Sequence, residues 1–135
     1  MIQRLCVCLL AVFCVTSETT AQTDQKRSER LNPPKVLYGT ASFYADKFEG
    51  RETANGEIFS QKHFTAACNV LPLGTWIRVT NLRNHRSVVV KINDRLHVRM
   101  KRIVDLSKAA ARKIRHLDGL VRVKIEVLGQ RRPEG

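Results

Sequence analysis

Acidic side chains are scarce in this sequence. Its 12 aspartates and glutamates are outnumbered by 24 lysines and arginines, which gives a formal net charge of +12 and an isoelectric point near 10.2. A charge this large favours anionic partners, namely nucleic acid, anionic lipid or an acidic polymer, without choosing among them. Because carboxylates are so few, each one is worth weighing as a functional group.

Cysteine is also scarce once the start of the chain is set aside. Three of the four cysteines fall within the first 21 residues: Cys6, Cys8 and Cys14. Those residues have the layout of a secretory signal peptide, with Arg4 before an uncharged apolar run over residues 5–15 and a small, polar cleavage site at residues 19–21. Export would leave Cys68 as the single cysteine, so no intrachain disulfide is expected.

Two other interpretations of residues 1–21 stay open. The apolar run is too short to span a membrane, and a buried helix is disfavoured by its abrupt polar flank. Cys14 could be the acylated residue of a lipoprotein, although Phe13 stands where a small residue is expected. Loss of Arg4 and Glu18 together leaves the net charge at +12. Export argues against nucleic acid and favours cell-wall polymers or membrane surfaces as partners.

The length of 135 residues allows one domain, and an apolar fraction of 43% allows a packed core but not a membrane bundle. Residues 22–35 are polar, lack apolar periodicity and include Pro33 and Pro34, which predicts a linker. We expect the folded domain over residues 36–128 and a tail over residues 129–135.

Alternating apolar residues predict a mostly β domain. Residues 36–45 indicate a strand interrupted at Gly39, and residues 74–94 indicate a β-hairpin whose connector is residues 83–85. Residues 120–128 alternate as a half-buried strand. A short apolar segment precedes Pro72. With five or six short strands and one helical crossover, the pattern predicts a small β-barrel.

The predicted helix follows the strand-like Ile103 and Val104. Apolar residues recur at helical spacing as far as Leu117, and Asp118-Gly119 supplies the stop. Asp105 or Ser107 could cap its first turn, because both side chains can accept backbone N–H bonds.

Asp94 is the carboxylate that the pattern singles out. It ends the apolar run over residues 88–92 and is followed by Arg95. Partial desolvation at the end of a buried strand disfavours the charged form of a carboxyl group and suits a general acid, whereas Arg95 acts in the opposite direction. The structural alternative is a strand-end turn in which Asp94 accepts backbone N–H bonds.

Other candidates have ordinary structural explanations. Asp105 fits a helix cap or a partner of Arg102, and Glu57 lies in a turn-like run. No metal-ligand spacing links His63, His85, His97 and Cys68. A nucleophile pair of Cys68 with His97 has no local support.

Three segments, "GTASFYADKFEGRETANGEIF", "FTAACNVLPLGTWIRVTNLRNHRSVVVKINDR" and "RIVDLSKAAA", together resemble the rare lipoprotein A (RlpA)-like lytic transglycosylases from about Tyr38 to Leu128. The resemblance implies a six-stranded double-psi β-barrel with one or two short helices and no cofactor. It also implies cleavage of the β-1,4 bond between N-acetylmuramic acid and N-acetylglucosamine without water. The muramyl 6-hydroxyl attacks its own anomeric carbon, which leaves a 1,6-anhydro end, preferably on strands without stem peptides.

The resemblance also implies site residues. Asp94 matches the catalytic aspartate of the N-D-R block, which would serve as acid and then as base, and Glu57 matches the groove glutamate of T-A-N-G-E. Cys68 stands where the family has a third important residue, a histidine. The same blocks imply substrate contacts for Tyr44, Thr53, Asn55, Gly56, Asn93 and Arg95.

Two departures from the family affect the expected activity. Cys68 offers a neutral thiol in place of an imidazole. Leu96, His97 and Val98 replace a glycine-proline turn, and His97 could take over part of the missing role. The resulting hypothesis is an exported, monomeric lytic transglycosylase of the periplasm or cell envelope, with peripheral association to the membrane or the division machinery. The alternative is a non-catalytic glycan-binding or wall-loosening module like the expansins.

Overall fold

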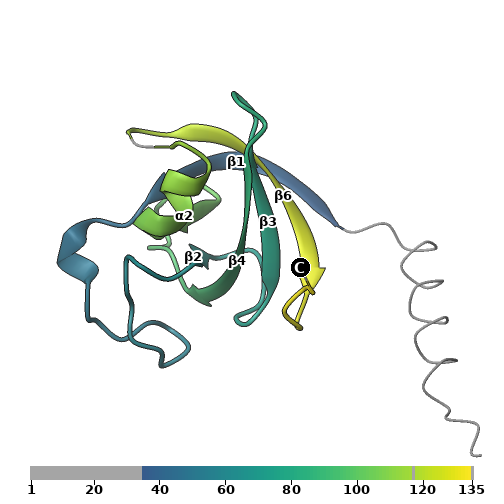
Figure 1. Ribbon diagram of the computed structural model, residues 1–135. Coiled ribbons are helices and arrows are strands. Elements are labelled where there is room, and N and C mark those ends of the chain that lie inside the picture. Colours follow the sequence, from purple (N-terminus) through teal and green to yellow (C-terminus); the bar gives the residue numbers. More distant parts are fainter. Residues whose placement is uncertain (1–34, 117, 135) are drawn as a thin grey trace, which may run out of the picture. The chain divides into compact units, whose positions relative to one another are not determined.

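The computed structural model describes residues 35–116 and 118–134. The expected signal peptide, Cys14 and nearly all of the expected linker therefore lie outside the described residues. Six strands form a closed barrel in the order β1-β5-β2-β4-β3-β6 (Figure 1). They span Val36–Phe43 (β1), Thr65–Cys68 (β2), Trp76–Asn81 (β3), Ser87–Asp94 (β4), Val104–Leu106 (β5) and Val121–Gly129 (β6).

The barrel confirms the expected six-stranded fold. Two neighbouring pairs, β1 with β5 and β2 with β4, are parallel, and the other four pairs are antiparallel. The expected hairpin is β3–β4, in which Ile77 pairs with Val90 and Val79 with Val88. His85 lies in its connector with a positive φ of 61°, which completes the tight turn.

The apolar side chains form two clusters of unequal size. The main core fills the barrel with one face of β3, β4 and β6, with Ala110 and Ala111 of the helix and with Ile114 at the helix end. The smaller cluster consists of Tyr44, Phe59, Ala67 and Leu96, with Phe48 packed against it. Its members come from the ends of β1, β2 and β4 and from the long β1–β2 connection, so it supports that end of the barrel.

The interruption expected at Gly39 is wrong, because β1 runs through this glycine without a break. A Cβ built at Gly39 would lie 2.7 Å from Ile103 Cγ2. The glycine therefore marks a close approach of the chain at Ile103 and leaves strand pairing with Val123 intact.

The helix α2 is shorter than its apolar spacing predicts and spans Lys108–Lys113. Ser107 caps its start, while Asp105 lies in β5 and pairs with Arg102. Arg115 adopts a positive φ of 52°, and His116 donates to the Ala111 carbonyl, so a Schellman turn ends the helix before Asp118-Gly119. A 3-10 turn, η1 (Asp46–Phe48), lies in the β1–β2 connection.

The end of α2 is fastened to the tip of the β3–β4 hairpin. Asn81 Nδ2 and Asn84 Nδ2 each donate to the Ile114 carbonyl at 3.0 Å, which satisfies an acceptor that the helix leaves unpaired. In the part of the chain that the structure describes, no helix has the length and apolar character needed to cross a membrane.

Candidate active site

The turn-like run around Glu57 is a loop held together by its own polar groups. The Thr53 amide donates to the Glu57 carbonyl at 2.7 Å, and the Gly56 amide donates to the Thr53 carbonyl at 3.0 Å. Asn55 Oδ1 accepts from the Thr53 hydroxyl at 2.7 Å and from the Glu57 amide at 3.1 Å. Gly56 has a φ of 89°, a conformation that glycine adopts without strain.

This loop docks on the end of β4 and so meets Asp94. The Asn55 amide donates to the Asn93 carbonyl at 3.2 Å, and the Ala54 amide donates to Asp94 Oδ1 at 3.0 Å. Residues about 40 positions apart in the sequence are thereby joined through backbone amides. The loop and the end of β4 bring together six of the predicted site residues, Thr53, Asn55, Gly56, Glu57, Asn93 and Asp94, and Tyr44 joins them as a seventh through its bond to Asp94.

Asp94 is half-buried and receives three hydrogen bonds from neutral donors. Tyr44 donates its hydroxyl to Oδ2 at 2.6 Å, and the Ala54 and Arg95 amides donate to Oδ1 at 3.0 and 2.8 Å. The two backbone bonds are those of the strand-end turn considered above, and they leave Asp94 half-buried at the end of β4. Oδ2 accepts a single bond from the described residues and keeps room for a further partner.

Tyr44 is a fixed donor to this carboxylate. Its ring packs on Phe59 at a centroid distance of 4.2 Å and edge-on against Phe48 at 5.7 Å. Burial raises the pKa of the Tyr44 hydroxyl, and the hydrogen bond to Asp94 and that residue's charge raise it further. The hydroxyl therefore stays protonated and orients Asp94 without exchanging a proton with it.

Glu57 has a cation beside it. Lys91 Nζ lies 2.6 Å from Glu57 Oε1, which also accepts from Asn55 Nδ2 at 2.9 Å, and Asn93 Nδ2 lies 3.2 Å from Oε2. The hydrogen bond from Lys91 lowers the pKa of Glu57, with smaller contributions from Asn93 and Asn55, against the effect of partial burial. Glu57 is thus a carboxylate rather than a proton donor near neutral pH.

Lys91 is a site residue that the sequence interpretation missed. It lies two positions before Asn93 on β4, and both side chains bond to Glu57. The alternation of residues 87–94 carried this signal, because it already placed Lys91 on the face opposite Val90 and Ile92. Asn93 itself is buried, and its Oδ1 has no hydrogen-bond partner among the described residues.

The Cys68 side chain and the Arg95 guanidinium lie apart from this network, although the Arg95 amide donates to Asp94. The Cys68 side chain is 0% exposed and packs in the main core, whereas its neighbour Ala67 packs in the cluster around Tyr44. Arg95 Nη1 donates to the carbonyls of Cys68 and Leu71, so its guanidinium braces the chain after β2. The thiol thus occupies the barrel interior rather than the network of Glu57 and Asp94.

His97 begins an exposed turn after β4. Its Nδ1 accepts from the Arg99 amide at 3.3 Å, and its carbonyl accepts from Met100. The imidazole thus bonds within its own turn. Across the described residues, no group of three His, Cys, Asp or Glu side chains is placed to hold a metal ion.

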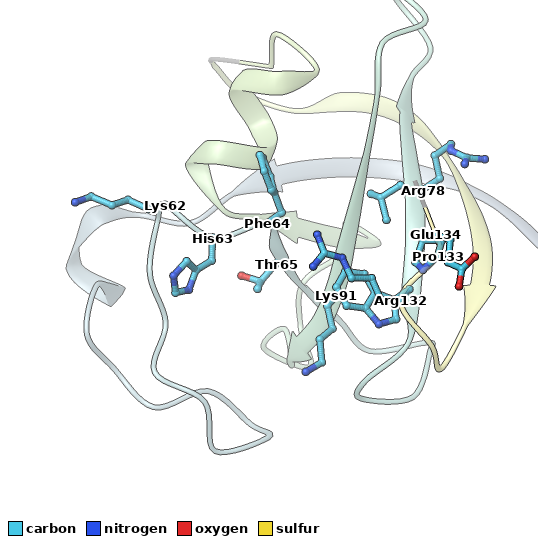
Figure 2. Close-up of a pocket in the computed structure, with 11 residues that line it drawn as sticks. Lys62, His63, Phe64, Thr65, Arg78, Lys91, Arg132, Pro133 and Glu134 are labelled. Atoms are coloured by element: carbon cyan, nitrogen blue, oxygen red, sulfur yellow. The ribbon is translucent and has the colours of Figure 1, made fainter.

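An open pocket of about 820 Å³ lies on the outer side of β3 and β4 (Figure 2). Lys91 lines it, and because the same ammonium reaches Glu57, the pocket borders the site. Asp94 does not line it. Its remaining walls come from residues 62–65, from Trp76, Arg78 and Val89, and from residues 132–134 after β6.

Comparison with known proteins places the chain in a family. The sequence model of the family described as lytic transglycolase matches residues 37–125. The chain belongs to this family. It is 42% identical over 114 residues to the endolytic peptidoglycan transglycosylase RlpA of Haemophilus influenzae, covering 84% of this chain and 40% of that one. Its counterpart in Pasteurella multocida is 50% identical over 91 residues, covering 67% and 31%. The resemblance stated from the motifs is thereby confirmed.

The chain spans less than half the length of these relatives. Solved structures share the fold at lower identity. A Streptomyces papain inhibitor has a TM-score of 0.57 at 22% identity, covering 70% of this chain and 96% of that one. An expansin of Clavibacter michiganensis has a TM-score of 0.58 at 18% identity, covering 75% and 53%. The second likeness agrees with the double-psi β-barrel.

Proposed function

We propose that this protein is an exported lytic transglycosylase of the cell envelope that cuts peptidoglycan glycan strands with Asp94 as acid and base. The observation that carries the proposal is the setting of Asp94, half-buried at the end of β4 and oriented by Tyr44, Ala54 and Arg95. The names of the relatives, endolytic peptidoglycan transglycosylases, support the substrate and the reaction type. Strands without stem peptides are the proposed preference.

The reaction needs one proton carrier. Protonated Asp94 gives its proton to the glycosidic oxygen as the bond from that oxygen to the anomeric carbon breaks. The muramyl 6-hydroxyl then bonds to the same carbon and returns its proton to the Asp94 carboxylate. No water is consumed, and the enzyme ends as it began. Oδ2 suits this exchange, since the described residues give it one hydrogen bond and give Oδ1 two.

Glu57 has the complementary role in this proposal. Ionised through its pair with Lys91, it stabilises the positive charge that develops on the sugar ring in the transition state. Four further residues hold the loop and the Glu57 carboxylate in place and do not contact the sugar ring in this proposal: Thr53, Asn55, Gly56 and Asn93. Arg95 acts in the same indirect way, by bracing the chain after β2.

A second candidate, a non-catalytic glycan-binding module, is favoured by one observation. Cys68 replaces the histidine of the family and its thiol is buried in the main core, so β2 supplies no imidazole to the site. If the family reaction depends on that imidazole, this chain binds glycan strands without cutting them.

Digestion of purified, peptide-free glycan strands separates the two candidates. Mass analysis of the products should find 1,6-anhydro-muramyl ends with the unaltered protein and about 10²–10⁴-fold fewer with Asp94→Asn. Sedimentation with the strands in the absence of any product, from either protein, would reject the enzyme and leave the binding module.

A further inference from the structure

The pocket beside Glu57 is lined by four cations and one carboxylate. The cations are Lys62, Arg78, Lys91 and Arg132, and the carboxylate is Glu134 (Figure 2). They come from four separate segments: the loop before β2, β3, β4 and the segment after β6. The segment expected to be only a tail thus contributes a wall, fastened by Gln130 Nε2 to Thr75 Oγ1 at 2.8 Å.

Flat aromatic surface lies among these charges. Trp76 is half-buried in the pocket with the Arg132 guanidinium 5.8 Å from its ring centroid. Phe64 is 44% exposed at the pocket wall, so part of its ring is open to a ligand. Aromatic faces beside cations suit a ligand that combines apolar ring faces with negative charge.

Lys91 connects this pocket with the site. Its ammonium lines the pocket and pairs with Glu57 at 2.6 Å, and its Cα lies three residues before Asp94, about 10 Å along a strand. A chain molecule held in the pocket would therefore lie within reach of Glu57 and Asp94. Nucleic acid or a lipid surface would also match the positive charge of the pocket, but the binding of either would not require the pocket to adjoin Glu57 and Asp94.

We propose that this pocket binds carboxylate-bearing sugars of the glycan strand that Asp94 cuts. Lysine and arginine pair with the carboxylates, and Trp76 and Phe64 face the pyranose rings. This inference rests on the proposed function for the identity of the strand. It adds that the protein recognises the acidic groups of the strand at a place separate from the bond that it breaks.

The test measures binding in the Asp94→Asn background, so that cutting of the strand is suppressed. The pocket variant carries Lys62→Gln, Arg78→Gln and Arg132→Gln and leaves Lys91 in place. The control variant carries Arg86→Gln, Lys101→Gln and Arg122→Gln, which removes three exposed cations that do not line the pocket. Both are compared on peptide-free glycan strands and on the same strands with their carboxylates converted to amides.

The pocket variant should bind the acidic strands about tenfold more weakly than the control, since three exposed charge pairs each contribute a few-fold. On amidated strands the difference between the two variants should vanish. Equal losses in the two variants, or equal binding of acidic and amidated strands by the parent, would overturn the inference. So would DNA or anionic vesicles that bind with the same affinity and the same dependence on the pocket.

Failure of the proposed function gives a different result. If the protein with Asp94 intact yields no anhydro ends while the binding contrast holds, the catalytic proposal is lost and the pocket remains a site for acidic glycan. Thermal unfolding of both variants checks that the pocket substitutions leave the barrel folded.

Discussion

Asp94 and Glu57 are two carboxylates joined by one loop, and their surroundings differ in charge. Asp94 is held by a hydroxyl and two backbone amides, all neutral. Glu57 is held by the ammonium of Lys91 and by two side-chain amides. The neutral donors orient the Asp94 carboxylate without placing a positive charge beside it, whereas the hydrogen bond from the Lys91 ammonium lowers the pKa of Glu57. This difference supports the proposed division of roles, in which Asp94 transfers the proton and Glu57 stabilises charge.

The largest effect should come from removing the proton carrier. We expect Asp94→Asn to lower the rate of anhydro-end formation by about 10²–10⁴-fold, the usual contribution of a general acid and base. The matched control is Asp46→Asn, whose carboxylate is exposed in η1 and pairs with Lys108. Product analysis by mass spectrometry measures both. Similar activity in the two variants would remove Asp94 from the reaction.

Tyr44→Phe tests the neutral donor. The phenylalanine ring keeps the packing against Phe59 but no longer donates to Asp94, a bond to a charged group of the kind that contributes about 1.5–3 kcal/mol. We expect kcat to fall about tenfold with KM unchanged, because in the proposed function the hydroxyl acts by orienting Asp94. Tyr38→Phe, at an exposed ring, is the control. A rise in KM instead would mean that Tyr44 binds substrate directly.

Lys91→Gln tests the cation. In the native protein the lowered pKa of Glu57 keeps the carboxylate ionised as the pH falls, and the benefit of the pair is lost only as the pH passes below that lowered pKa. Without Lys91 the pKa of Glu57 should rise, so the acid limb of the pH–activity profile should move to higher pH.

At neutral pH the Lys91→Gln loss should be at most about fivefold, as expected for a partly exposed pair. A carbon NMR titration of the Glu57 carboxyl group checks the direction independently. An acid limb that stays in place while the titration of Glu57 moves would separate this residue from the reaction.

The smallest effect on activity should come from Cys68, whose side chain bonds to neither Asp94 nor Glu57. Because Cys68 is buried in the main core, Cys68→His should overpack it and lower the free energy of unfolding by about 1–3 kcal/mol without raising activity. Cys68→Ala serves as a small-residue control, and chemical denaturation measures both. A large gain in rate at unchanged stability would show that the imidazole reaches the site.

Local alternation was enough to predict much of the barrel. In β3, β4 and β6 one face is buried and the other half-exposed, so a period of two was visible in the sequence. In β2 all four residues are buried, and no pattern indicated that Ala67 and Cys68 pack in different clusters. The helix end was missed because a non-glycine residue, Arg115, adopts the positive φ.

The site was only partly predictable for a related reason. The motifs pointed to Asp94 and Glu57 as candidates, but the amide of Ala54 and the ammonium of Lys91 contact them across about 40 and 34 positions of sequence. Contacts of this kind depend on how the β1–β2 connection folds back on β4, which neither alternation nor spacing encodes. The roles of Arg95 and Cys68 depended on the same long-range geometry.

The raised pKa of the Tyr44 hydroxyl allows the site to be followed by ultraviolet absorbance. The chain has two tyrosines, Tyr38, which is 60% exposed, and Tyr44, which is buried against Asp94. In an alkaline titration followed by ultraviolet absorbance, the phenolate band of Tyr44 should emerge only when its contact with Asp94 gives way. The part of the phenolate absorbance that comes from Tyr44 would then report whether the contact between Tyr44 and Asp94 at the end of the barrel is intact.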